Sequence, residues 1–115
     1  MKLVEILTQA AGLGVSDVHI TVNKPPVYRL HGVLYPLDDP DFKGRLELLS
    51  GYEIKPLTPA QTDEMAREIM SREQYEKFNN QGELDFSFAV PGTTRVRVNV
   101  FKQRNSTALV MRLLR

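Results

Sequence analysis

Hydrophobic residues recur along the chain with two periods, and these periods separate the expected helices from the expected strands. From Leu3 to Leu13 the apolar residues repeat at the spacing of one helical face, and glycines mark the end of this segment. Two further segments, at about 59–70 and 72–79, carry apolar residues at helical spacing. We therefore expect an N-terminal helix and a pair of helices in the middle of the chain.

Both central helices have a start signal with a physical mechanism. Thr58 is followed by Pro59 and, three positions after the threonine, by Gln61, while Ser71 is followed by Gln74 at the same spacing. A hydroxyl before a helix accepts a hydrogen bond from an otherwise unpaired backbone amide, and the glutamine returns the bond. This pattern fixes where each helix should begin.

Strands are expected where apolar and polar residues alternate with period two. They cover residues 18–22, 27–30, 33–37, 83–90, 95–104 and 108–115. Only His31 and Gly32 separate the second and third of these strands, which fits a tight hairpin. The stretch 38–52 is expected to be a loop with one helical turn.

The order of elements is helix, three strands, two helices and three strands. It indicates one α+β domain over residues 1–115, with a mainly antiparallel sheet of about six strands and the helices on one side. A chain of 115 residues that is 42% hydrophobic can bury a core without disulfides or a metal.

The strand at 95–104 places valines on one face and a polar set on the other. To bring the apolar faces together, we expect Phe88 opposite Val98 and Phe86 opposite Val100, with a five-residue turn between the strands. The other face of this strand then carries a set of four residues that share one parity. They are Arg95, Arg97, Asn99 and Phe101.

The next hairpin is expected to close near Gln103 and Ala108, which places Asn99 opposite Arg112. Three arginines then share one sheet face, where they repel one another unless an anion or acids compensate. Phosphate is a natural complement, because the arginine fork donates paired hydrogen bonds to it. Cross-strand pairing with Asp85 and Glu83 is the alternative, and pairs on an exposed face stabilise a fold little.

The net charge of +1 hides an asymmetry along the chain. Residues 1–90 carry 9 lysines and arginines against 14 acids, whereas the remainder carries six basic residues and no acid. The basic residues are Arg95, Arg97, Lys102, Arg104, Arg112 and Arg115. A basic block on strands indicates an anionic partner that meets a folded surface, and pairing with the acidic remainder of the domain is the open alternative.

Several kinds of chemistry are excluded by composition and spacing. The chain has no cysteine, and no ligand stands at metal-binding spacing from either histidine, so no metal site is expected. Ser16, Asp17 and His19 cannot form a catalytic relay on one strand, and Asp17 is expected to cap a turn. No phosphate-binding GxxxxGK[ST] loop exists, so this chain by itself is not expected to be an enzyme.

Three stretches resemble the N-terminal, PAS-like domain of the PilT-like type IV pilus retraction ATPases, within the type II and IV secretion ATPase superfamily. They are GVSDVHITVNKPPVYRLHGVLYPL (14–37), LTPAQTDEMAREIMSREQYEKF (57–78) and GELDFSFAVPGTTRVRVNVFKQR (82–104). The family's Ser-Asp-aliphatic-His-aliphatic pattern, its ELDFS strand and its RxRxNxFxQR strand are all present. Residues 38–56 depart from the short connection that is usual in the family.

The resemblance implies a domain that precedes a RecA-like motor domain in a cytoplasmic homohexameric ring, without nucleic acid or membrane insertion. In such motors ATP and Mg sit on the motor domain, and the ring meets the pilus platform protein of the inner membrane indirectly. By motif position, Arg95 and Arg97 are the first candidates to approach the ATP phosphates, with Arg104 and Arg112 behind them. No cofactor is expected in this domain alone.

Two other functions remain open on the residues themselves. A stand-alone PAS-like ligand-sensing module needs an enclosed apolar pocket, for which the sequence gives no sign. A single-stranded nucleic-acid-binding module is permitted by the basic strand and Phe101, whereas the acidic remainder argues against a broad footprint.

Overall fold

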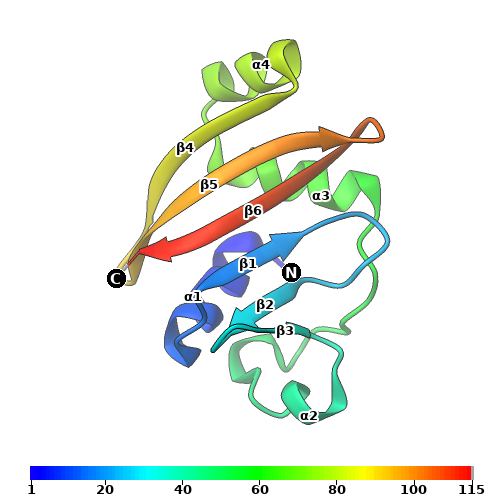
Figure 1. Ribbon diagram of the computed structural model, residues 1–115, viewed down its shortest axis with the longest axis vertical. Helices are drawn as coiled ribbons and strands as arrows, with labels where there is room; N and C mark the ends of the chain where they lie inside the picture. Colours follow the sequence, from blue (N-terminus) through cyan, green and yellow to red (C-terminus); the bar gives the residue numbers. More distant parts are fainter. Residues whose placement is uncertain (115) are drawn as a thin grey trace.

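A six-stranded antiparallel sheet organises the domain in the computed structural model, which describes residues 1–114 (Figure 1). The strand order across the sheet is β3-β2-β1-β6-β5-β4. The strands are β1 (Asp17–Ile20), β2 (Val27–Leu30), β3 (Val33–Pro36), β4 (Glu83–Val90), β5 (Thr94–Gln103) and β6 (Ser106–Leu114). The helices are α1 (Leu3–Leu13), α2 (Pro40–Lys43), α3 (Pro59–Ile69) and α4 (Arg72–Gln81), with a 3₁₀ turn at Glu47–Leu49. The α+β fold expected from the sequence is confirmed.

Helices α1 and α3 cover one face of the sheet, and the core lies between them and the strands (Figure 1). Val18, Val98 and Met111 lie on this face without exposed surface. The hydroxyl of buried Tyr28 donates to the Ile6 carbonyl of α1, which ties the helix to β2. One face of the sheet is therefore buried and the other is left open. Within residues 1–114, no helix is long and apolar enough to cross a membrane.

The two predicted capping boxes are confirmed. Thr58 and Gln61 exchange hydrogen bonds of 3.2 and 2.9 Å at the start of α3. Ser71 and Gln74 exchange bonds of 3.1 and 2.9 Å at the start of α4. At the end of α1, Gly14 has a φ of 78°, a left-handed conformation that glycine adopts without steric cost.

Turn geometry sets the hairpins. The predicted turn between β2 and β3 is confirmed, with His31 at φ 51° and Gly32 at φ 78°. The strand predicted at 18–22 is shorter than expected, because β1 ends at Ile20 and Val22 instead forms a parallel bridge with Leu57.

Both predicted registers around β5 were wrong by two residues. A three-residue turn, rather than a five-residue one, joins β4 to β5, so Phe86 lies opposite Val98. A two-residue turn joins β5 to β6, so Arg97, not Asn99, lies opposite Arg112. Because a shift of two residues keeps every side chain on its face, the predicted division into core face and polar face still holds.

The segment 38–52 is more ordered than the predicted loop with one helical turn. It contains the short helix α2 and the 3₁₀ turn, and Phe42, Leu46 and Leu49 enter the core. The amide of Leu48 donates to the buried Gln9 side chain at 2.6 Å. Burial of these three side chains thus holds the segment in place, although it contains no long helix or strand.

Candidate functional site

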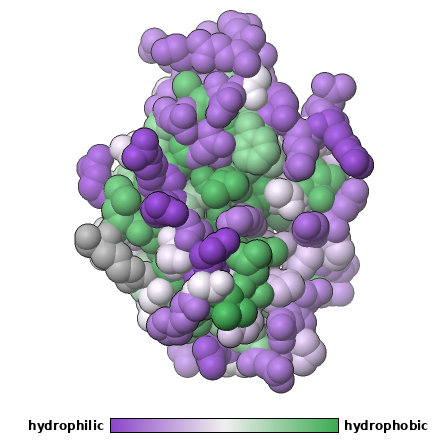
Figure 2. Space-filling view, viewed as in Figure 1, coloured by the Kyte–Doolittle hydropathy of each residue, from purple (hydrophilic) through white to green (hydrophobic). Residues whose placement is uncertain are grey.

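The sheet face opposite α1 and α3, here called the open face, carries the arginines singled out in the sequence. Figure 2, in the same view as Figure 1, shows mainly hydrophilic side chains over the sheet, with hydrophobic groups between them. The arginines of β5 point here because Val96, Val98 and Val100 occupy the core face with no exposed surface. Alternation along one strand therefore produces both the core and the candidate site.

The strand registers align an arginine row across four strands of the open face. Asp17 of β1 pairs with Arg29 of β2 on one side and with Arg112 of β6 on the other. Arg112 in turn lies opposite Arg97 of β5, which lies opposite Ser87 of β4. We use the name arginine row for Arg29, Asp17, Arg112 and Arg97.

Asp17 is the acid within the arginine row. Its Oδ1 lies 3.3 Å from Nε of Arg112, and its Oδ2 lies 4.0 Å from Nε of Arg29. The Ser16 hydroxyl donates to Asp17 Oδ2 at 2.7 Å. The expectation that Asp17 caps a turn was wrong, because the residue opens β1 and its carboxylate points into the row. A carboxylate this buried needs such charged and hydrogen-bonding partners.

The acids of β4 do not compensate Arg97. Asn99 donates to Asp85 at 2.9 Å and to Glu83 at 3.0 Å, so one amide holds both carboxylates. Among residues 1–114, no hydrogen bond or ion pair involves the Arg97 side chain, which is exposed. Its guanidinium is therefore open to an external anion.

A shallow hollow of about 250 Å³ lies on the open face between Arg97 and Arg112. Its other lining residues are Asp17, Asp85, Val98, Asn99 and Val110. The two arginines of the hollow lie on adjacent strands, and an acid lies at either end. Because these acids would repel a longer chain of negative charges, the hollow suits a small anion better than an extended polyanion.

The structure places the other two arginine candidates differently. Arg95 lies two residues from Arg97 on the same face, where its Nη2 lies 3.4 Å from the Ser87 hydroxyl. Arg104 sits in the β5–β6 turn with a φ of 51°. It is seven residues from Arg97, roughly 23 Å along an extended strand. The structure thus groups Arg95, Arg97 and Arg112, and leaves Arg104 apart. Arg115 lies outside the described residues.

Sequence reasoning missed Arg29 as a member of the site. The signal was the alternation in VYRL, which places Arg29 on the face opposite Tyr28, together with the hairpin that pairs β1 with β2. His19 also faces the open side, and burial lowers its pKa despite the opposing charge of Asp17. Within residues 1–114, no three histidine, cysteine or acidic side chains come together as a metal site would require.

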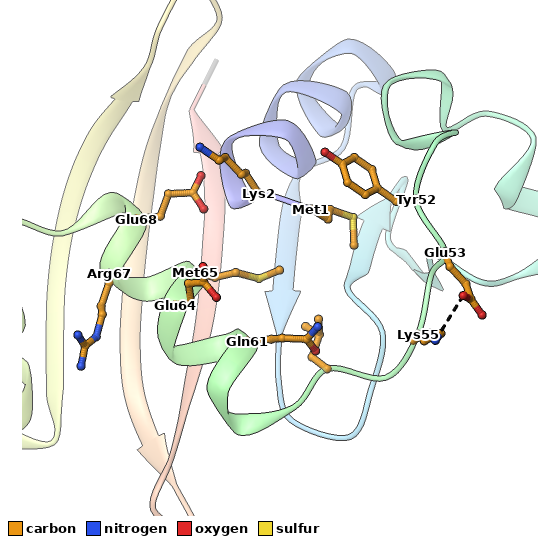
Figure 3. A pocket seen from close by; sticks show the side chains of 11 residues that line it. Met1, Lys2, Tyr52, Glu53, Lys55, Gln61, Glu64, Met65, Arg67 and Glu68 are labelled. Carbon is orange, nitrogen blue, oxygen red and sulfur yellow. Dashed lines mark ion pairs between the residues drawn. The ribbon is translucent and has the colours of Figure 1, made fainter.

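A larger hollow of about 640 Å³ lies on the helix side, between the start of α1, residues 52–57 and α3 (Figure 3). Most of its lining side chains are charged or polar and exposed, including Lys2, Glu64 and Glu68. The Glu68 carboxylate accepts hydrogen bonds from the amides of Leu3 and Val4 at 2.9 and 3.0 Å, so it satisfies backbone amides at the start of α1. This hollow is not the enclosed apolar pocket that a ligand-sensing module needs.

Comparison with known proteins identifies close relatives over the whole chain. The type IV pilus retraction ATPase PilT of Pseudomonas aeruginosa is 32% identical over 114 residues, covering 99% of this chain and 29% of PilT. The type IV pilus ATPase PilU of the same organism is 29% identical over 111 residues, covering 96% of this chain and 24% of PilU. A crystal structure of the pilus retraction motor PilT with bound ADP matches with a TM-score of 0.81 and 34% identity, covering 100% of this chain and 29% of that chain.

A more distant match concerns the fold alone. The ATPase DotB of Legionella pneumophila matches with a TM-score of 0.65 at 16% identity, covering 96% of this chain and 27% of that chain. No protein-family model matches the chain. The chain spans less than a third of the length of the curated relatives it matches. Over nearly its whole length the chain is homologous to the N-terminal domain of PilT.

Proposed function

We propose that this chain is the N-terminal regulatory and assembly domain of a hexameric PilT-like motor, and that its open face supplies arginines to the nucleotide. The observation that carries the proposal is the pairing of Arg97 with Arg112 across β5 and β6, with no acid bound to Arg97 among residues 1–114. ATP and Mg would be held by a RecA-like motor domain, and the chain itself would not be catalytic.

The proposal rests on the chemistry of guanidinium groups. Arginine donates planar, paired hydrogen bonds that match phosphate oxygens, and two arginines side by side make a site with two such donors. The solved PilT structure that resembles this chain contains ADP, which supports a phosphate-bearing ligand in the full-length protein. Arg97 is the primary contact in this proposal, and Arg95 and Arg112 flank it.

The same contact would couple chemistry to movement. An arginine that reaches a terminal phosphate only when two domains close loses that attraction after hydrolysis and release. The angle between the N-terminal domain and the motor domain would then follow the state of the nucleotide. In a pilus machine this movement would drive retraction at the cytoplasmic side of the inner membrane, through the platform protein.

ATPase turnover of the full-length protein tests the proposal. Arg97→Ala and Arg95→Ala are expected to leave the domain folded and to lower turnover, because each removes a donor for the phosphates. Arg104→Ala is the matched control, because it removes the same charge from the β5–β6 turn, away from the arginine row. Unchanged turnover in both Arg95→Ala and Arg97→Ala would contradict the proposal.

A further inference from the structure

Asp17 lies at the centre of the arginine row and contacts an arginine on each side. Strand pairing sets Arg29 beside it on β2 and Arg112 beside it on β6. The Asp17 side chain is only 11% exposed, whereas those of Arg29 and Arg112 are 44% and 71% exposed. A buried acid thus holds two arginines whose outer parts are in solvent.

The atoms used in these contacts leave the arginine forks free. Asp17 meets Arg112 and Arg29 through their Nε atoms, one on each carboxylate oxygen. Among residues 1–114, no hydrogen bond involves the terminal Nη atoms of Arg29 or Arg112. Each guanidinium therefore keeps its two terminal amines available for another acceptor.

Ser16 fixes the carboxylate that makes these contacts. Its hydroxyl donates to Asp17 Oδ2 at 2.7 Å and lies 3.2 Å from the Arg29 carbonyl oxygen. Its amide also donates to that carbonyl at 2.9 Å. The acid is thereby anchored to the backbone of β2, so it has little freedom to follow a moving arginine.

The charge arrangement requires such an anchor. Arg97 and Arg112 lie directly opposite each other, and like charges in that position on neighbouring strands repel. Asp17 attracts Arg112 from the side away from Arg97. Without it, nothing on β1 or β2 would counter the repulsion, and Arg112 would lose its fixed position.

We propose that Asp17 is a positioning residue that presents Arg112, and with it Arg29, to a phosphate bound next to Arg97. The role rests on the proposed function of the open face. Asp17 does not contact the phosphate, but it holds Arg112 by Nε and so leaves the terminal amines of this arginine available to the phosphate. Arg29 thereby becomes a further phosphate-contacting residue of the arginine row.

The proposal predicts that loss of the Asp17 charge weakens phosphate binding, which is the opposite of what simple electrostatics predicts. Replacement of Asp17 by Asn removes a negative charge from the row, which by charge alone should strengthen the binding of any anion. If Asp17 acts by positioning, the same replacement weakens binding, because two charge-assisted donors lose their orientation. Asp85→Asn is the matched control, because Asp85 lines the same hollow but contacts Asn99 rather than an arginine.

The first measurement is the binding of inorganic tripolyphosphate to the chain, followed by NMR titration at low ionic strength. Asp17→Asn is expected to weaken binding by roughly tenfold, because the loss of even one of the two charge-assisted donors has an effect of this size. Asp85→Asn is expected to leave binding unchanged or strengthen it. Equal or tighter binding by Asp17→Asn would overturn the positioning role.

The second measurement reads Arg112 directly, without any ligand. The Nε–H of Arg112 is expected to exchange with solvent faster in Asp17→Asn than in the unsubstituted chain, whereas that of Arg97 should not change. Equal exchange rates at Arg112 would overturn the proposal.

If Asp17→Asn lowers the thermal midpoint so far that the chain unfolds, Ser16→Ala replaces it, because it keeps the charge and removes only the anchor at 2.7 Å. Ser16→Ala should then weaken tripolyphosphate binding and speed the exchange at Arg112, and no change in both would overturn the proposal.

Arg97→Ala in the same titration separates this proposal from the proposed function. If Arg97→Ala binds tripolyphosphate as well as the unsubstituted chain, the phosphate-binding function of the open face is wrong. If Arg97→Ala weakens binding and Asp17→Asn does not, the face binds phosphate and only the positioning role is wrong.

Discussion

Arg97 and Arg112 lie directly opposite each other on adjacent antiparallel strands of the open face. Asp17 contacts Arg112 at 3.3 Å from the other side, and no acid among residues 1–114 contacts Arg97. Two like charges held this close stabilise no fold by themselves. The arrangement is consistent with a surface that is completed by an anion from outside the domain.

The first prediction is that Arg97 contributes nothing to the stability of the domain. Arg97→Ala should change the free energy of unfolding by no more than about 0.5 kcal/mol, and in the stabilising direction, because it relieves repulsion with Arg112. Urea unfolding of the chain measures this, with Arg104→Ala as the control for loss of charge. A destabilisation well above that range would show that Arg97 has a structural role.

The second prediction concerns the pH dependence set by Asp63. Burial opposes ionisation of this carboxyl, but hydrogen bonds from Tyr75, Thr107 and Arg67 outweigh it and lower the pKa of Asp63. A lowered pKa in the folded state stabilises the fold above the pKa of the unfolded chain, at about 3.9, and this stabilisation is lost as pH falls through the folded value.

Thermal unfolding between pH 2 and pH 7, an interval around the ordinary pKa of about 3.9, tests this prediction. Asp63→Asn should be less stable at neutral pH, and its stability should fall less steeply in acid than that of the unsubstituted chain. Asp85→Asn serves as the control, since Asp85 accepts from Asn99 on the open face rather than from the core network. Parallel pH profiles for Asp63→Asn and the unsubstituted chain would contradict the assignment.

The third prediction concerns the link between α1 and the sheet. Tyr28 is buried, its hydroxyl donates to the Ile6 carbonyl, and burial raises the pKa of this phenol. Tyr28→Phe should lower the free energy of unfolding by about 1 kcal/mol, because it removes one buried hydrogen bond and keeps the ring. Urea unfolding measures the loss. Tyr35→Phe is the control for the loss of a tyrosine hydroxyl, because it keeps a ring that stacks on Phe42 at a centroid distance of 4.9 Å. Equal stability of Tyr28→Phe and the unsubstituted chain would show that the bond contributes little.

The fourth prediction tests a helix start. Thr58→Ala should lower the free energy of unfolding by about 1 kcal/mol, because the threonine accepts from the Gln61 amide at the start of α3. Thr58→Ser keeps the hydroxyl and should retain most of the stability. Equal losses in the two variants would mean that the cap is not the cause.

Local rules allowed the elements and their faces to be predicted from the sequence. The capping boxes at Thr58 and Ser71 and the hairpin at His31 depend on residues within a few positions of each other, and all three are confirmed. The register was predicted wrongly because it depends on turn length. Arg104 and Asn105 both adopt positive φ and form a two-residue turn between β5 and β6. Asparagine favours this conformation, but arginine does not, so the sequence did not indicate so short a turn.

The arginine row could be predicted only in part, for a related reason. Alternation places Arg95, Arg97 and Arg112 on one face, as expected. The contact of Asp17 with Arg112 joins residues that are 95 positions apart, through the pairing of β1 with β6. No local pattern specifies that β6 lies beside β1, so the contact of Asp17 with Arg112 could not be predicted, whereas the alternation in VYRL does place Arg29 on this face.

The central claim is that Arg97 contacts the terminal phosphate of a nucleotide held by the motor domain. The most direct measurement compares the affinities of the full-length protein for a non-hydrolysable ATP analogue and for ADP, with and without Arg97→Ala. We predict that the substitution weakens binding of the ATP analogue by about tenfold, the effect of a lost charge-assisted bond, and leaves ADP affinity nearly unchanged. An equal effect on both nucleotides, or no effect on either, would contradict the claim.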